Sequence, residues 1–169
     1  MNNLKLFVML GLVVGTIIIG AIFISSKSKT ETKAMLSSIS GAEVLIDHAA
    51  KTVGDIGFSD GILYHSFPIR NNGTKDLEIA NMTTSCMCTK VFLRQNGKDG
   101  PSFGMKGMSA PSDWKGILRP GEEGEVVAAF DPAYHGPQGV GKISRFVSFE
   151  TNDPDNPYVE FSFEGNVVK

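Results

Sequence analysis

A long uncharged apolar run close to the N-terminus constrains this chain more than any other feature. From Leu6 to Ile24 the sequence contains no charged residue, and it lacks the polar interruptions at helical spacing that a buried soluble helix would show. At about 1.5 Å per residue, a helix over this run is just long enough to cross a hydrocarbon core of roughly 30 Å. We therefore expect residues 1–24 to form a membrane anchor that crosses the cell membrane once.

A cleaved signal peptide is the alternative interpretation of this run. Lys5 supplies a charged start, but the apolar stretch is longer than the core of a usual signal peptide. Phe23 and Ile24 lead directly into Ser25, so no small-x-small cleavage site follows the run. These features favour an anchor that is retained.

The charges beside the run bear on its orientation. Lys27, Lys29 and Lys33 follow the run, whereas only Lys5 precedes it, and positive charge favours the cytoplasmic side. Long domains, however, translocate largely regardless of charge, and the N-terminal tail is very short. We expect the rest of the chain to lie in the periplasm or on the outer side of the membrane.

Charge and composition after the run exclude one class of partner. The formal net charge is −2 at pH 7, with acidic and basic residues interspersed, and there is no concentrated basic patch of the kind that binds nucleic acid. Residues 25–40 are rich in Ser, Lys and Thr and show no apolar periodicity, which is typical of a polar tether.

From residue 41 onward the pattern indicates strands. In the last segment Val159, Phe161 and Phe163 would lie on one face, with polar residues between them on the other. Strands are also predicted around Val44–Ile46, 61–70, Leu77–Ile79, 125–131 and Val147–Phe149. Short alternating strands without a long helical pattern predict an all-β fold, an antiparallel β-sandwich.

The segment Asn96–Gly116 interrupts this pattern. It is crowded with Gly, Pro, Ser and Lys and contains Met105, Met108 and Trp114. Such long irregular segments are usually functional or mobile loops, so we expect it to project from one end of the sandwich.

Several short motifs follow one another between Val53 and Val168. They are Gly54-Asp55-Ile56, Phe67 with Asn71-Asn72-Gly73, Leu77 with Ile79, Ser85-Cys86-Met87-Cys88-Thr89, Pro120-Gly121-Glu122, and Thr151-Asn152-Asp153-Pro154 with Gly165. This ordered set resembles a bacterial immunoglobulin-like family catalogued as domain of unknown function 1573.

The resemblance implies an immunoglobulin-like β-sandwich over residues 41–169, related to those of pilus chaperones and sperm-protein-like domains. It also implies an exported protein without an established activity. The chain departs from the family pattern in two places. Met87 replaces the central Gly of the family's Cys-Gly-Cys element, and Asn96–Gly116 is longer than the family usually needs.

Cys86 and Cys88 are the only cysteines, and three hypotheses for them stay open. In an extended strand their thiols would share one face about 6.5–7 Å apart, whereas a turn would bring them closer. They are two small, partly buried residues at a strand end, or ligands of a soft metal ion, or a disulfide. An exported location favours oxidised cysteines, but a pair two residues apart closes a tight ring that should be easily reduced.

The metal hypothesis places a soft ion such as Cu(I) on Cys86, Cys88 and Met87, because thiolates and thioethers suit that ion. Further thioethers are available from Met82, Met105 and Met108, although methionines commonly fill gaps in cores. Two arguments oppose Met87. A side chain there restricts the tight backbone that a glycine would allow, and in an extended strand it would point away from both thiols.

The histidines and the known catalytic motifs do not indicate an enzyme. His65 shares strand parity with Phe67 and Ile69, which predicts a core-edge histidine with its polar atoms satisfied, and His135 lies in a loop that we expect to be exposed. No Gly-x-Ser-x-Gly, His-Glu-x-x-His or phosphate-loop spacing occurs, so we expect no enzymatic activity.

Two functions of different class follow. The first is a membrane-anchored extracytoplasmic binding or scaffolding module, with an unknown protein partner and no cofactor. The alternative is a soft-metal (copper) binding or redox protein centred on Cys86 and Cys88.

Overall fold

The structure is a computed structural model that describes Met9, residues 11–16 and residues 33–169. Met9 and residues 11–16 are helical. Among these described residues, no helix has the length and apolar character required to cross a membrane. Most of the anchor expected over residues 1–24 lies outside the described residues and stays a prediction. The expected tether is described only from Lys33.

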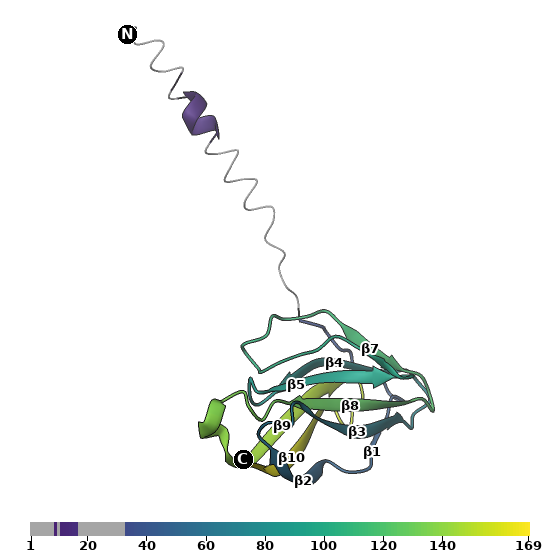
Figure 1. The fold of residues 1–169 in the computed structure, drawn as a ribbon. Coiled ribbons are helices and arrows are strands. Elements are labelled where there is room, and N and C mark those ends of the chain that lie inside the picture. The colour runs from purple at the N-terminus through teal and green to yellow at the C-terminus, as the bar shows by residue number, and fades with distance from the viewer. Residues whose placement is uncertain (1–8, 10, 17–32) are drawn as a thin grey trace. The chain divides into compact units, whose positions relative to one another are not determined.

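Residues 33–169 form two five-stranded sheets that pack as a sandwich (Figure 1). The first sheet contains, in spatial order, β1 (Val44–Ile46), β3 (Leu63–Asn71), β8 (Glu123–Phe130), β5 (Thr89–Gln95) and β6 (Lys98–Asp99). The second contains β2 (Ala50–Gly57), β10 (Tyr158–Val168), β9 (Gly141–Thr151), β4 (Leu77–Thr84) and β7 (Lys115–Leu118). A 3₁₀ turn, η1 (Gly136–Gly139), lies between β8 and β9. The predicted all-β sandwich is confirmed.

The core forms where the alternating apolar residues of both sheets meet. Phe161 of β10 stacks on Phe67 of β3, with ring centroids 4.6 Å apart and planes at 9°, and Phe149 of β9 lies 5.7 Å from Phe161. All three rings are fully buried. Val159 and Phe163 are also buried, whereas Glu160 between them is exposed, so the predicted alternation of the last strand is confirmed.

The predicted antiparallel sandwich has one exception among the strands of residues 33–169, which is β2. This strand runs parallel to β10, from Ala50 opposite Ser162 to Gly57 opposite Val168. The pair is not joined by a hairpin, because the two strands lie near opposite ends of the domain sequence. A tight hairpin can join only antiparallel strands, whereas the long stretch of chain between β2 and β10 allows them to pair in parallel.

The segment Asn96–Gly116 does not simply project from the sandwich. Phe103 and Val91 of β5 exchange two backbone hydrogen bonds of 2.8 and 2.9 Å, and Met105 forms a bridge to Thr84 of β4. Phe103 also packs against Trp114, with ring centroids 5.5 Å apart. The segment lies along the sheets because it satisfies backbone groups at the β5 edge and buries aromatic surface.

The motif Asn71-Asn72-Gly73 ends β3 in a turn that does not use the positive φ that Asn and Gly tolerate. Neither Gly73 nor the asparagines have a positive φ. The buried Asn71 instead accepts the Gly73 N–H through Oδ1 and donates through Nδ2 to the carbonyls of Lys75 and Leu118. Gly73 is required by space, because a Cβ there would lie 2.2 Å from the carbonyl oxygen of Gly41.

The turn between β9 and β10 carries buried polar residues that connect distant strands. Asp153 is 1% exposed and accepts the N–H of Val44 in β1 at 2.9 Å. Asn152, also 1% exposed, accepts the N–H of Glu78 in β4 and donates to the carbonyl of Asp76. A motif that reads as a surface turn therefore joins both sheets.

Residues 33–40, assigned from sequence to the tether, contact the domain. The Ala34 N–H donates to the Ser112 carbonyl, and the Ala34 carbonyl accepts from Nδ2 of Asn81. Lys33 pairs with Glu150 at 2.7 Å, and Ala34 is buried.

Candidate functional site

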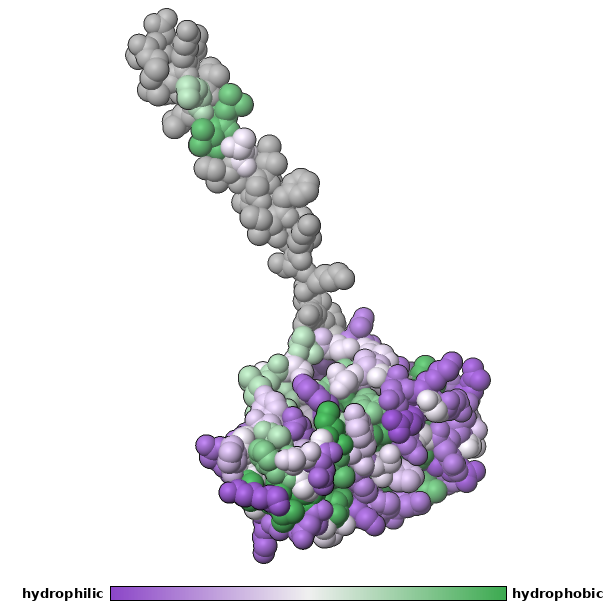
Figure 2. Space-filling model, viewed as in Figure 1, coloured by the Kyte–Doolittle hydropathy of each residue, from purple (hydrophilic) through white to green (hydrophobic). Residues whose placement is uncertain are grey.

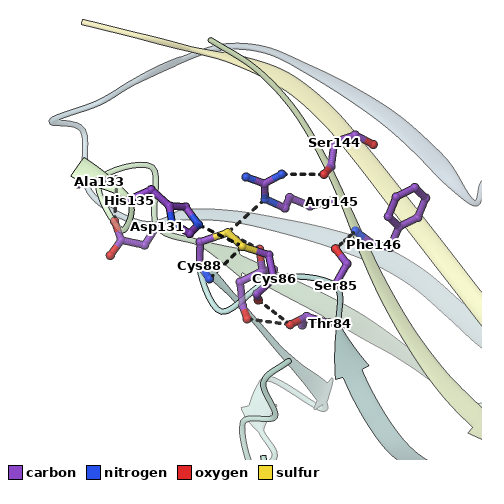
Figure 3. The surroundings of a disulfide bond; sticks show 11 residues. Thr84, Ser85, Cys86, Cys88, Asp131, Ala133, His135, Ser144, Arg145 and Phe146 are labelled. Carbon is purple, nitrogen blue, oxygen red and sulfur yellow. Dashed lines mark hydrogen bonds between the residues drawn. A yellow bond between two sulfur atoms is a disulfide. The ribbon is translucent and has the colours of Figure 1, made fainter. Parts of the chain in front are cut away.

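The Cys86–Cys88 pair lies in the turn by which the chain passes from β4 in the second sheet to β5 in the first (Figure 3). The Thr89 N–H donates to the Cys86 carbonyl at 3.2 Å and closes the turn. The Thr84 hydroxyl lies 2.9 Å from the Cys86 carbonyl oxygen and 3.1 Å from that of Thr89. The two cysteines are thus held close together, with Cα atoms 5.3 Å apart, instead of lying along an extended strand.

Neighbouring elements hold this turn from both sides. The Asp131 N–H, just after β8, donates to the Cys88 carbonyl at 2.9 Å. On the other side, Ser85 donates its N–H to the Phe146 carbonyl, and the Phe146 N–H donates to the Ser85 hydroxyl. The sulfur atoms therefore occupy a fixed position at one end of the sandwich.

Cys86 and Cys88 form a disulfide with one residue between them. Cys86 is half-buried and Cys88 is 2% exposed, so one sulfur is more accessible than the other. The Cys88 N–H lies 3.3 Å from the Cys86 Sγ atom. Of the three sequence hypotheses, the disulfide describes this state of the protein; the metal hypothesis concerns the reduced thiols and stays a prediction.

His135 contacts the more accessible sulfur. Its Nε2 atom lies 3.3 Å from Cys86 Sγ, although 49 residues separate the two in sequence. The side chain is exposed, as expected, and its ring lies 5.1 Å from that of Tyr134. The sequence indicates no role for His135, because no local pattern shows that the β8–β9 loop returns to the cysteine turn.

Arg145 contacts the buried sulfur. Its Nε–H donates to Cys88 Sγ at 3.1 Å, and its guanidinium carbon lies 5.5 Å from the centroid of the Phe130 ring. Arg145 forms none of the ion pairs found among residues 33–169. Burial lowers the pKa of this half-buried guanidinium below its ordinary value. Figure 3 shows Arg145 and His135 on either side of the disulfide.

One sequence signal pointed to Arg145 and was missed. Arg145 shares strand parity with Ile143, Val147 and Phe149, all of which are buried. A charged residue at an inward-facing position requires a polar partner. Here the partners are the Cys88 sulfur and the carbonyl oxygen of Ser144, which accepts from Nη1 at 2.8 Å.

Met87, the expected third ligand, is 42% exposed. It has no positive φ, so this turn forms without the glycine found in the family pattern. Among the other methionines, Met82 is 4% exposed in the core and Met108 is 64% exposed. The structure thus brings a histidine and an arginine to the sulfurs, two residue types that the sequence hypothesis did not include.

His65 is a second unusual polar group, on β3. It is half-buried and packs edge-on against Phe67, with ring centroids 4.6 Å apart. Its buried Nε2 atom has no hydrogen-bond partner among the described residues, so the expectation of a satisfied histidine was wrong. Burial lowers the pKa of His65, and the charges of His48 and Lys51 lower it further.

Comparison with known proteins supports the expected family resemblance. Residues 45–99 match the model of the family described as protein of unknown function (DUF1573), so the resemblance is confirmed over this segment, which includes Cys86 and Cys88. Among curated proteins, no sequence match was found.

Solved structures resemble the sandwich at low sequence identity. A protein of unknown function from Porphyromonas gingivalis W83 is 18% identical with a TM-score of 0.52, and the match covers 83% of this chain and 51% of that one. The chain thus spans about half the length of that relative. The PapD-like domain 7 of human CEP192 is 16% identical with a TM-score of 0.42, covering 84% of this chain and 96% of that domain. The Class 5 fimbriae chaperone CfaA is 12% identical with a TM-score of 0.41, covering 75% and 57%.

Proposed function

We propose that this chain is a membrane-anchored, extracytoplasmic binding module that holds a protein partner at the disulfide end of its sandwich. One observation carries the proposal: exposed apolar side chains surround a rigid turn at that end. Met87, Tyr134 and Phe146 are 42%, 46% and 41% exposed. We call these three residues the apolar rim.

Each residue of the apolar rim is connected to the cysteine turn. Met87 lies between the cysteines, Phe146 is hydrogen-bonded to Ser85, and Tyr134 packs beside His135. Aromatic residues and Met are enriched at protein interfaces, where they supply large contact areas. Much of the remaining surface is hydrophilic, as the face in Figure 2 illustrates.

The proposed location draws on the uncharged N-terminal run and on the disulfide. Disulfides persist in oxidising compartments outside the cytoplasm and are rare inside it. In intact spheroplasts of a bacterial host, external protease should remove the domain and leave the anchor. Protection of the domain until the membrane is lysed would reverse the proposed topology, and a mature protein beginning near Ser25 would rule out the retained anchor.

The binding proposal can be tested with a photo-crosslinking amino acid at single positions in living cells. A crosslinker at Tyr134 should capture a discrete partner, whereas one at Ile117 should not. Ile117 is a matched control because it is 48% exposed but lies on β7, opposite Glu78 near the start of β4 and away from the cysteine turn. Equal crosslinking at both positions, or none at Tyr134, would contradict a binding site at the rim.

A thiol–disulfide exchange function is the second candidate, and the contacts of the two sulfurs favour it. An incoming thiolate can reach half-buried Cys86, which would release Cys88 as a thiolate beside the Arg145 guanidinium. Cations next to a cysteine favour the thiolate form. A disulfide with a sequence separation of 2 closes so short a loop that it removes little entropy from the unfolded chain. A mainly stabilising role therefore does not explain it.

This second function requires that the disulfide be reduced while the domain stays folded. Incubation with a dithiol, followed by counting of free thiols without denaturant, should find both cysteines reduced at an unchanged circular dichroism spectrum. Thiols that appear only after denaturant is added would exclude exchange and would leave the binding function intact.

A further inference from the structure

We propose that reduction converts the disulfide into a three-ligand Cu(I) site made of Cys86, Cys88 and His135. This ligand set comes from the fold, because His135 lies 49 residues from Cys86 in sequence. The two Sγ atoms and a ring nitrogen of His135 all lie within 4.8 Å of one another. The site does not depend on the apolar rim; it requires only that the disulfide can be reduced.

The spacing of these atoms suits one metal ion. Ligand bonds of roughly 2.0–2.3 Å place neighbouring donor atoms about 3.5–4 Å apart around a shared ion. His135 Nε2 and Cys86 Sγ are already 3.3 Å apart. Once the S–S bond is broken, half-buried Cys86 can rotate its thiol away from Cys88 by the small distance that the ion needs.

The donor set favours Cu(I) over Zn²⁺. Thiolates are soft ligands that select Cu(I), and imidazole also binds copper. Structural Zn²⁺ sites are almost always four-coordinate, whereas the group of His, Cys, Asp and Glu donors found among the described residues ends at three. The Asp131 carboxylate is not part of that group, and its Oδ1 atom accepts the Ala133 N–H.

The charge of Arg145 also favours a monovalent ion. Two thiolates with Cu(I) carry a net charge of −1, which the guanidinium beside Cys88 would neutralise. In the disulfide state the half-buried Arg145 has no carboxylate partner among residues 33–169. Reduction would create thiolates beside it and so supply the missing negative charge. Two thiolates with Zn²⁺ carry no net charge, so the positive charge of Arg145 would remain without a partner.

The reduction step balances with a dithiol as the reductant. One thiolate of the dithiol attacks Cys86 Sγ, the Cys86–Cys88 bond breaks, and Cys88 leaves as a thiolate. The second thiolate of the dithiol then attacks the first sulfur of the dithiol, which is bonded to Cys86 in the mixed disulfide, and Cys86 is released as a thiolate. The cysteines gain two electrons and two protons, the dithiol leaves as a disulfide, and Cu(I) later replaces the two thiol protons.

The test uses the full chain in detergent micelles, reduced with a phosphine, desalted under anaerobic conditions and checked for two free thiols. Cu(I) is supplied as its complex with a chromophoric chelator, and transfer to the protein is followed by the loss of chelator absorbance. We expect one Cu(I) per chain. Binding by the reduced chain should be tighter than by the oxidised chain by at least about 100-fold, because oxidation removes both thiolate ligands.

Three variants identify the ligands. Cys86→Ser/Cys88→Ser should bind no better than the oxidised chain, which serves as a natively folded control if the double variant does not fold. His135→Gln should weaken binding by at least about 10-fold, because loss of a group that only orients a ligand already costs about 10- to 100-fold and His135 is itself a ligand. His48→Gln, an exposed histidine on the segment between β1 and β2, should leave the affinity unchanged.

Several results would overturn the proposal. They are equal Cu(I) affinity in the reduced and oxidised chains, an affinity of His135→Gln equal to that of the unmodified chain, or binding of Zn²⁺ as tight as that of Cu(I). A chain that cannot be reduced while folded would also overturn it, because the site would then never form. If the chain has two free thiols but does not bind Cu(I), the copper site is excluded, whereas thiol–disulfide exchange is not.

Discussion

The Nε–H group of Arg145 donates to the Sγ atom of Cys88 at 3.1 Å across 57 residues of sequence. Arg145 belongs to β9 in the second sheet, whereas Cys88 directly precedes β5 in the first. The contact therefore joins the two layers at the end of the sandwich where His135 reaches Cys86. It also places a cation beside the sulfur that would leave as a thiolate when Cys86 is attacked.

Replacing Arg145 should therefore slow the chemistry of the reduced site. In Arg145→Gln the guanidinium charge is lost, so a smaller fraction of Cys88 should be thiolate at pH 7. The rate of alkylation by iodoacetamide should fall by roughly 10-fold, since a neighbouring cation favours the reactive thiolate. Mass spectrometry of the reduced protein can follow the modification of Cys88 separately from that of Cys86.

A matched control for this experiment is Arg70→Gln, because Arg70 is an exposed arginine on β3 and faces away from the core. It should leave the alkylation rate unchanged. If both variants react at the rate of the unmodified chain, the Arg145 contact has no effect on the thiolate.

Truncation of Phe161 should destabilise the domain severely. Its ring is fully buried between Phe67 and Phe149, so Phe161→Ala removes the burial and leaves a cavity. The free energy of unfolding should fall by about 3–5 kcal/mol. Glu160→Ala, one residue earlier on the exposed face, should be nearly neutral in the same urea titration. Equal losses in the two variants would show that the alternation of β10 does not determine its packing.

Asp153 should contribute stability that depends on its charge. Its carboxylate accepts hydrogen bonds from the N–H groups of Val44 and Asp155 and from Nδ2 of Asn156. Burial alone raises the pKa of Asp153, but these hydrogen bonds outweigh burial, and the net pKa lies below its ordinary value of 3.8. Asp153→Asn places an amide donor among these donors and should cost about 2–3 kcal/mol at neutral pH.

The sign of the pH dependence follows from that lowered pKa. Between the folded pKa and 3.8 the unfolded chain binds more protons, so the stabilisation is present above 3.8 and is lost as the pH falls through the folded pKa. The stability difference between the unmodified chain and Asp153→Asn should be constant above about pH 5 and shrink below about pH 4. Asp155→Asn, an exposed neighbour, should show neither effect. A difference that persists unchanged at pH 3 would mean that the carboxylate charge is not the source of the stabilisation.

Gly73 should tolerate no side chain, although its φ is not positive. A Cβ there would lie 2.2 Å from the Gly41 carbonyl oxygen and 2.8 Å from the Glu43 nitrogen, both of which belong to backbone. Gly73→Ala should therefore cost about 1–3 kcal/mol, the usual range for overpacking, and should lower the thermal midpoint. Asn72→Ala, in the same turn but exposed, should change the midpoint little. A midpoint that is unaffected in Gly73→Ala would show that the segment before β1 can move away from the turn.

The sequence alone predicted six of the ten strands found among residues 33–169, together with the faces that they bury, but it indicated none of β2, β5, β6 and β7. Val159, Phe161 and Phe163 alternate with polar residues, and this period of two is a local property that each strand carries wherever it lies. Sequence also singled out Cys86 and Cys88, whose spacing is a short-range relationship. It assigned neither the parallel partner of β2 nor the course of Asn96–Gly116, because both depend on which edges are left open once the sheets form.

Only the tertiary structure decided the surroundings of the disulfide. His135 and Arg145 reach the sulfurs from the β8–β9 loop and from β9, 49 and 57 residues away. The chain crosses from one sheet to the other at the cysteine turn. This turn is hydrogen-bonded to the residue after β8 and to β9, so His135 and Arg145 lie close to the sulfurs. The period of two along a strand predicts whether a side chain faces the core, and it does so for Arg145. The partner that the side chain contacts there is determined by how the two sheets pack.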